Sequence, residues 1–327
     1  MNIEDLKKGL LEGNTRYLAK SITLIETTNL SKRENADRLL NSILPYTGKS
    51  LRIGISGVPG VGKSTFIETF GKFLTSIGKK VAVLAVDPSS KISGGSILGD
   101  KTRMQELSKD ANAFIRPSPS GESLGGVARK TRESILLCEA AGYDVVIVET
   151  VGVGQSEIAV ASMVDCFVLL QLPGAGDELQ GIKKGIMEIS DIILINKAEA
   201  DNKPKALLAK KQIENALHIL KPRADKWQVR VLLVSALKNE GIEAFWKTLR
   251  YFETHMKNNG LFFEKRKEQS VDWMYKLLND EIMRIFKSNE NVKKKLPDYI
   301  ENVKSGKENP ASATKKLIAE FFKDNHN

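Results

Sequence analysis

A glycine-rich turn, set between an apolar run and a helical pattern, constrains the fold of this chain more than any other feature. Residues 51–56 are mostly apolar, as in a buried strand, and Phe66, Phe70 and Leu74 recur at the spacing of a helix. Between them, residues 57–64 read Gly-Val-Pro-Gly-Val-Gly-Lys-Ser and fit the pattern G-x-x-x-x-G-K-S. A strand, such a loop and a helix in this order predict a phosphate-binding site.

Each residue type in this loop has a physical reason. Glycines let backbone N–H groups approach phosphate oxygens, because no Cβ stands in the way. Lys63 can reach the β- and γ-phosphates, and the Ser64 hydroxyl can hold Mg²⁺. We therefore expect the phosphates along the loop and the start of the helix, at Gly57, Val58, Pro59, Gly60, Val61, Gly62, Lys63, Ser64 and Thr65.

The rest of the central region alternates between strand and helix patterns. Nearly continuous apolar runs, typical of parallel strands covered on both faces, predict strands at 51–56, 80–86, 145–149, 166–172, 191–196 and 229–234. Helical spacing is clearest at 63–77, 124–142, 203–220 and 241–256. This order predicts an α/β fold with a doubly wound, mostly parallel sheet, whose ligands bind at the carboxyl ends of the strands.

Helical patterns flank this region on both sides. We expect an N-terminal helical extension over 1–48, a nucleotide-binding domain over 49–257 and a C-terminal helical region over 258–327. The C-terminal region begins with an apolar stripe from Val271 to Phe286. A Lys-rich turn and helices near 298–304 and 311–322 follow it. The stripe either packs back on the sheet domain or forms a dimer arm.

Composition narrows the function classes. The net charge is +10, but only 6% of residues are aromatic and no stacking motif accompanies the lysines. This favours solvated helix faces over a nucleic-acid surface. Cys138 and Cys166 lack metal-ligand spacing and are expected to be reduced core residues of a cytoplasmic protein. A polar N-terminus and the absence of a long apolar run argue against a signal peptide and a membrane span.

Two acids are expected near a metal ion. Asp87 follows the strand at 80–86 and would lie at the carboxyl edge of the sheet, although Asp-Pro is also a common exit from a strand. Asp100 lies in the glycine-rich segment 93–104, which could fold over a γ-phosphate or be a passive linker.

The strand at 145–149 ends in a third acid. Glu149 can hold a metal through water, and the N–H of Gly152 can approach the γ-phosphate. Gln155 either orients the attacking water or is a switch-loop residue that never touches it. Lys63, Asp100, Glu149 and Gln155 are therefore the candidate catalytic residues.

The strand at 191–196 ends in Asn-Lys-x-acid, which GTPases use to read guanine. The carboxylate of Glu199 would accept from the ring N1–H and the exocyclic amine, Asn196 would contact the base edge, and the stem of Lys197 would cover the ring. Glu replaces the usual Asp and moves the carboxylate by about 1.5 Å; Asp201 is a weaker candidate for the same role. The loop Ser235, Ala236 and Leu237 would close over the base.

Together these stretches resemble one family, the GTPase chaperones of adenosylcobalamin-dependent methylmalonyl-CoA mutase. That family belongs to the signal-recognition and nitrogenase-iron-protein-like class and was formerly labelled as lysine/arginine/ornithine transport kinases. The similarity covers nearly the whole chain, and Glu199 departs from the family's usual Asp. It is carried by residues 16–26, 57–65, 87–90, 94–100, 149–157, 171–180 and 196–199.

The resemblance implies more than the residue patterns do. It implies a homodimer formed with help from the C-terminal helices, slow hydrolysis of GTP with Mg²⁺, and nucleotide-gated loading of adenosylcobalamin into the mutase. Segment 172–183 would relay the nucleotide state to the mutase. Carried over by motif, the Mg²⁺ environment comprises Ser64, Asp87, Asp100 and Glu149.

Three other functions fit the sequence less well. A nickel-insertion GTPase would need His/Cys clusters, whereas His218, His255 and His326 are far apart in sequence. A transport kinase would need a separate acceptor-substrate domain, and the sequence shows none. A nucleic-acid-binding NTPase is favoured only by the net charge. Other cobalamin-dependent acyl-CoA mutases, acting on isobutyryl-CoA or ethylmalonyl-CoA, remain alternative partners.

Overall fold

The computed structural model describes most of the chain and divides it into two compact units. These are Met1–Lys265 and Arg266–Asn327. The division falls close to the predicted start of the C-terminal region at 258, and the predicted domain bounds stay predictions. The structure describes residues 2–27, 29–86, 104–117, 124–150, 155–174, 184–219 and 227–323.

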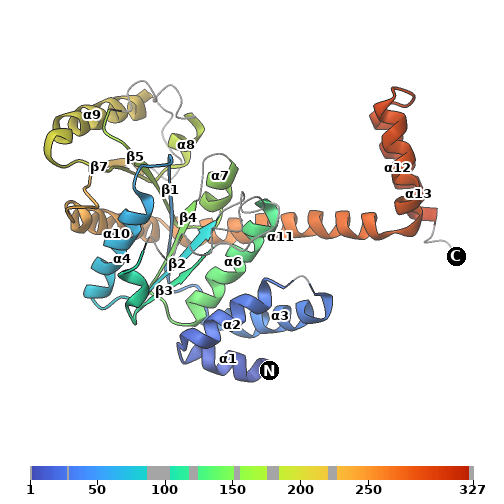
Figure 1. The fold of residues 1–327 in the computed structure, drawn as a ribbon, viewed down its shortest axis with the longest axis horizontal. Coiled ribbons are helices and arrows are strands. Elements are labelled where there is room, and N and C mark those ends of the chain that lie inside the picture. The colour runs from blue at the N-terminus through green and yellow to red at the C-terminus, as the bar shows by residue number, and fades with distance from the viewer. Residues whose placement is uncertain are drawn as a thin grey trace. The chain divides into compact units, whose positions relative to one another are not determined.

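The first unit is built on a seven-stranded sheet in which every described strand pair is parallel (Figure 1). Its order is β3-β2-β4-β1-β5-β6-β7, so the chain starts in the middle and winds outward in both directions. This confirms the predicted doubly wound α/β fold. The strands are β1 Leu51–Gly57, β2 Val81–Val86, β3 Ala113–Arg116, β4 Val145–Thr150, β5 Cys166–Gln171, β6 Ile192–Ile195 and β7 Arg230–Leu233.

Helices cover both faces of this sheet. On one face, Phe66 and Phe70 of α4 (Lys63–Ser76) pack with Phe245 of α10 (Ile242–Asn258) in a core that also holds Ile53 and Ile55 of β1. The opposite face packs against α6 (Leu124–Ala140) and α7 (Gln155–Ala161) (Figure 1). Near β6 and β7, a third core involves α8 (Lys184–Ile189) and α9 (Lys203–Ile219).

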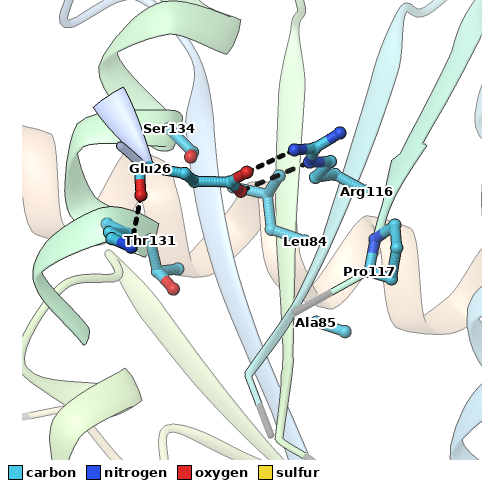
Figure 2. A pocket seen from close by; sticks show the side chains of 8 residues that line it. Glu26, Leu84, Ala85, Arg116, Pro117, Thr131 and Ser134 are labelled. Carbon is cyan, nitrogen blue, oxygen red and sulfur yellow. Dashed lines mark hydrogen bonds and ion pairs between the residues drawn. The ribbon is translucent and has the colours of Figure 1, made fainter. Parts of the chain in front are cut away.

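The N-terminal helices share the core of the α6 face. They are α1 (Ile3–Leu11), α2 (Thr15–Ile25) and α3 (Leu30–Ile43). Glu26, which follows α2, bonds to two elements of the sheet domain. Its carboxylate accepts from the guanidinium of Arg116 on β3, and its carbonyl accepts from Nζ of Lys130 on α6 at 2.6 Å. Figure 2 shows Glu26 and Arg116 meeting beside Leu84 of β2, where they line a small pocket. The predicted extension is thus packed on the nucleotide domain.

The described part of the C-terminal region consists of three helices joined by short turns. It comprises α11 (Leu261–Ser288), α12 (Glu290–Lys304) and α13 (Pro310–Lys323). The predicted Lys-rich turn is wrong, because residues 293–295 lie inside α12. The side chain of Asn289 caps that helix by accepting from the N–H groups of Asn291 and Val292, and lysine is a good helix former.

Within the second unit, α12 and α13 pack on each other. Val292 of α12 and Ala313 of α13 are buried, and Lys295 lies 3.1 Å from Glu320. The end of α11 also contacts α13, since the rings of Phe286 and Phe321 are 5.4 Å apart. Across the described ranges of both units, every helix is too short or too polar to span a bilayer.

Candidate nucleotide-binding site

The phosphate loop connects β1 to α4 and needs glycine at two of its positions. Gly62 precedes α4 with a left-handed φ of 92°, and a Cβ there would come within 2.7 Å of Asn196 Nδ2. A Cβ on Gly57 would come within 2.6 Å of the Leu170 carbonyl oxygen on β5. The loop therefore lies tight against the ends of the neighbouring strands, with no space for side chains at these points.

Lys63 folds across its own loop. Its ammonium donates to the Gly57 carbonyl at 2.6 Å and lies 3.4 Å from the Val58 carbonyl. The side chain is half-buried, so the cation is held within the loop and not extended into water. An anionic phosphate bound to the loop amides would meet this charge directly.

The first residue pair of the expected metal environment is brought together. Ser64 Oγ donates to Glu149 Oε1 over 3.3 Å, and Glu149, on β4, is only 3% exposed. A hydroxyl beside a buried carboxylate is an oxygen donor set of the kind that Mg²⁺ prefers, so these residues fit that ion. Val86, which precedes Asp87, pairs in register with Thr150. Asp87 and Asp100 themselves lie outside the described residues.

The side chain of Asn196 connects the phosphate loop to the loop after β7. Its Nδ2 donates to the Val61 carbonyl at 2.9 Å, and its Oδ1 accepts from the Ala236 N–H at 3.1 Å. The residue is 2% exposed, so its contact with the base edge stays a prediction. Thr69 of α4 adds a second tie to the same loop by donating to the Ala236 carbonyl at 2.9 Å.

Lys197 also connects the base motif to the phosphate loop. Its ammonium donates to the Gly60 carbonyl at 2.8 Å while its side chain remains exposed. Its φ is 59°, a left-handed value that is uncommon outside glycine and that often marks functional sites. The exposed stem is therefore available to cover a bound ring, as the sequence predicts.

Glu199 carries an acceptor with no partner among the described residues. The side chain is half-buried, and its Oε2 atom is buried without a hydrogen bond. A buried carboxylate oxygen left unpaired is costly, and the N1–H and amine of guanine could satisfy it. The predicted recognition of guanine by Glu199 is therefore consistent with the position of this oxygen, and it stays a prediction.

The loop after β7 has a defined shape. Ser235 and Glu240 exchange backbone hydrogen bonds of 3.0 Å, and Ser235 Oγ accepts from the Lys238 N–H at 3.1 Å. Leu237 at its tip is 75% exposed, so an apolar side chain faces solvent beside the base motif. Such a side chain fits the predicted cover for guanine.

The remaining predicted residues lie at or outside the ends of the described segments. Gln155 is the first residue of α7, and its side chain is outside the description. Gly152 and the relay positions 175–183 also lie outside the described residues. Among the residues that are described, no group of three or more His, Cys, Asp or Glu side chains could hold a metal ion.

The fold and these contacts define a class of protein. A glycine-rich phosphate loop, a buried acid on the adjacent strand and an Asn-Lys-x-acid motif stand together at the carboxyl edge of a parallel sheet, as in phosphate-binding-loop GTPases. The sequence model of one such family, described as "Methylmalonyl Co-A mutase-associated GTPase MeaB", matches residues 18–291. The chain belongs to this family.

Individual proteins agree with this assignment. "GTPase ArgK" of Escherichia coli is 48% identical over 96% of this chain and 94% of its own length. "Methylmalonic aciduria type A homolog, mitochondrial" of Mus musculus is 46% identical over 99% of this chain and 80% of its own. The solved "LAO/AO transport system kinase" is 41% identical, covers 99% of both chains and superposes with a TM-score of 0.79. The resemblance inferred from the sequence is confirmed.

Proposed function

We propose that this chain is a GTP-hydrolysing chaperone that assists the loading, protection and reactivation of adenosylcobalamin in methylmalonyl-CoA mutase. The observation that carries the proposal is membership of a family described as mutase-associated, across residues 18–291. The mouse relative, named for methylmalonic aciduria, adds support because it aligns with 99% of this chain. Another cobalamin-dependent acyl-CoA mutase is the alternative partner.

The phosphate groups of GTP bind along the loop in this proposal. The backbone N–H groups of residues 57–65, which Pro59 lacks, face the phosphate oxygens, and Lys63 neutralises charge that develops on the bridge between the β- and γ-phosphates. Ser64 and Glu149 hold Mg²⁺ together with Asp87 and Asp100, and the ion supplies further charge stabilisation when bound. Gln155 and the Gly152 N–H act on the attacking water and the γ-phosphate.

Guanine is read by Glu199. Its unpaired buried oxygen accepts from the base, an interaction that adenine cannot provide because adenine lacks the N1–H and the amine beside it. Lys197 covers one side of the ring, and Ser235, Ala236 and Leu237 close the other. Segment 172–183 relays whether GTP or GDP is bound.

The active form in this proposal is a homodimer. Large apolar side chains of α11 are about half exposed: Val271 50%, Met274 55%, Leu278 49% and Ile282 54%. These residues recur at helical spacing on a 28-residue helix and form a stripe that a second copy can cover. The Leu278→Asp and Ile282→Asp variants should shift the mass measured by light scattering from dimer to monomer. A parent chain that is monomeric at tens of micromolar would contradict this part.

Capture of the mutase tests the partner. Immobilised chain, loaded with a non-hydrolysable GTP analogue or with GDP, is exposed to purified methylmalonyl-CoA mutase, with an isobutyryl-CoA mutase as the comparison. We expect retention of the methylmalonyl-CoA enzyme that differs between the two nucleotides. Equal background retention of both enzymes in both states would remove the proposal.

A further inference from the structure

Two buried hydroxyls join the strand that carries the phosphate loop to the strand that carries Glu149. Thr150 Oγ1 donates to Ser56 Oγ over 2.8 Å, and both residues have an exposure of 0%. Ser56 immediately precedes Gly57, and Thr150 immediately follows Glu149. The bond therefore connects β1 and β4 at the points where the chain leaves the sheet to build the site.

The surroundings make this bond strong and specific. Ile55 pairs with Glu149 in the parallel register, and alternate residues point to opposite faces, so Ser56 shares a face with Gly54. That face is apolar and is covered by α7: a Cβ on Gly54 would come within 2.8 Å of Val160. In such a place each hydroxyl needs a partner, because an unpaired buried polar group is costly.

We propose that Ser56 and Thr150 are positioning residues for GTP hydrolysis. They fix the end of β4, and with it Glu149, against the strand from which the phosphate loop begins. Neither side chain touches the nucleotide. The inference rests on the assignment of the phosphate loop and Glu149 to the nucleotide site.

The position of the bond predicts which kinetic step it affects. Groups expected to hold the phosphates lie on residues 57–65, at the end of β1, in the loop that follows it and in the first turn of α4. Glu149 lies on β4 and contacts Ser64 at 3.3 Å, so a shift of β4 changes the environment of the metal and the γ-phosphate. Loss of the bond should therefore lower kcat and leave the affinity for GDP nearly unchanged.

The test uses substitutions that keep the shape of the core. Thr150→Val retains the branched side chain without the hydroxyl, Ser56→Ala removes the acceptor, and Thr150→Ser restores a hydroxyl. We expect kcat for GTP to fall about fivefold to about tenfold in Thr150→Val and Ser56→Ala, the effect of losing one net hydrogen bond. The double variant should be no slower than the slower single variant, since both remove the same interaction. Thr150→Ser should recover at least about half of the parental kcat.

Thr131→Val is the matched control. Thr131 is also buried, and its hydroxyl donates at 2.8 Å to the Val127 carbonyl within α6. This variant should keep the parental kcat, which separates positioning at the site from a general loss of a buried hydroxyl. Melting temperatures of all variants show that each is folded at the assay temperature, and Ser56→Ala decides the question if Thr150→Val does not fold.

Several results would overturn the proposal. Parental kcat in both Thr150→Val and Ser56→Ala would do so, and so would a GDP affinity that falls as much as kcat. An equal loss of kcat in Thr131→Val would show a merely structural effect. Lys63→Ala separates this inference from the site assignment. If Lys63→Ala hydrolyses GTP at the parental rate, the assignment of the nucleotide site is wrong. If Lys63→Ala is inactive while Thr150→Val and Ser56→Ala keep the parental kcat, only the role of the hydroxyl pair fails.

Discussion

Replacing Glu199 with alanine should weaken guanine-nucleotide binding strongly without disturbing the fold. The carboxylate is half-buried, and its Oε2 has no hydrogen bond among the described residues. Much of the desolvation cost of that oxygen is therefore present before the nucleotide binds. Two N–H donors of guanine would each form a bond to a charged acceptor, and losing both should cost about 2–4 kcal/mol. This corresponds to a loss of affinity of about 30-fold to about 1,000-fold.

The assay is a fluorescence titration with GDP labelled on the ribose, followed by competition with unlabelled GTP and ATP. Glu199→Ala should lower the affinity for GTP while leaving that for ATP nearly unchanged, so the preference for guanine falls by the same factor. Glu199→Gln, which matches the shape and keeps one acceptor oxygen, should lie between the parent and Glu199→Ala.

Asp201→Ala is the control for this prediction. Asp201 is an exposed acid two residues further on, and it is the weaker candidate for reading the base. It should bind GDP as the parent does. An affinity in Glu199→Ala within about twofold of the parent would refute the reasoning, and a loss seen only in Asp201→Ala would move base recognition to that residue.

Three further predictions concern other parts of the first unit. Lys63→Ala should lower kcat/KM for GTP by about 100-fold or more, because the ammonium beside the Gly57 carbonyl no longer meets phosphate charge; steady-state phosphate release measures this. Glu149→Gln should raise the Mg²⁺ concentration for half-maximal turnover by about tenfold to about 100-fold, as measured in a magnesium titration at saturating GTP. Burial raises the pKa of the Glu133 carboxyl above its usual value of 4.5 despite the neighbouring Arg129. The folded protein therefore holds this proton more tightly than the unfolded chain does, and the free energy of unfolding falls as pH rises from the unfolded-state pKa through the folded-state pKa. The free energy of unfolding of Glu133→Gln, relative to that of the parent, should therefore be higher at pH 7 than at pH 4. Urea unfolding at both pH values measures this difference.

The sequence predicted the parts of this fold that depend on local pattern. Inner strands such as β2 and β5 are buried on both faces and read as nearly continuous apolar runs, and the phosphate loop has a fixed spacing. Strand β3 was missed because its apolar run is only Ala113, Phe114 and Ile115, with Asn112 before it and Arg116 after it. The turn predicted at 293–295 is wrong because Asn289 caps the helix before the lysines, so that residues 293–295 lie inside α12.

Contacts between distant residues explain what the sequence could not predict about the site. Asn196 bonds to Val61, 135 positions earlier, and to Ala236, 40 positions later. The Ser56–Thr150 bond spans 94 positions. No local spacing encodes such pairs, because they exist only once β1, β4 and β6 are neighbours or near neighbours in the sheet. The motif predicts that Asn196 contacts the base, and the folded chain shows its side chain bonded to the backbone of two loops.

GTP turnover by the full chain, measured alone and with increasing amounts of methylmalonyl-CoA mutase, tests the central claim most directly. A chaperone whose catalytic arrangement is completed by its partner should hydrolyse GTP slowly alone. Its kcat should rise at least about tenfold at saturating mutase, and Lys63→Ala should show no rise. A kcat for GTP that stays constant across the mutase titration, with ATP hydrolysed equally well, would contradict the account.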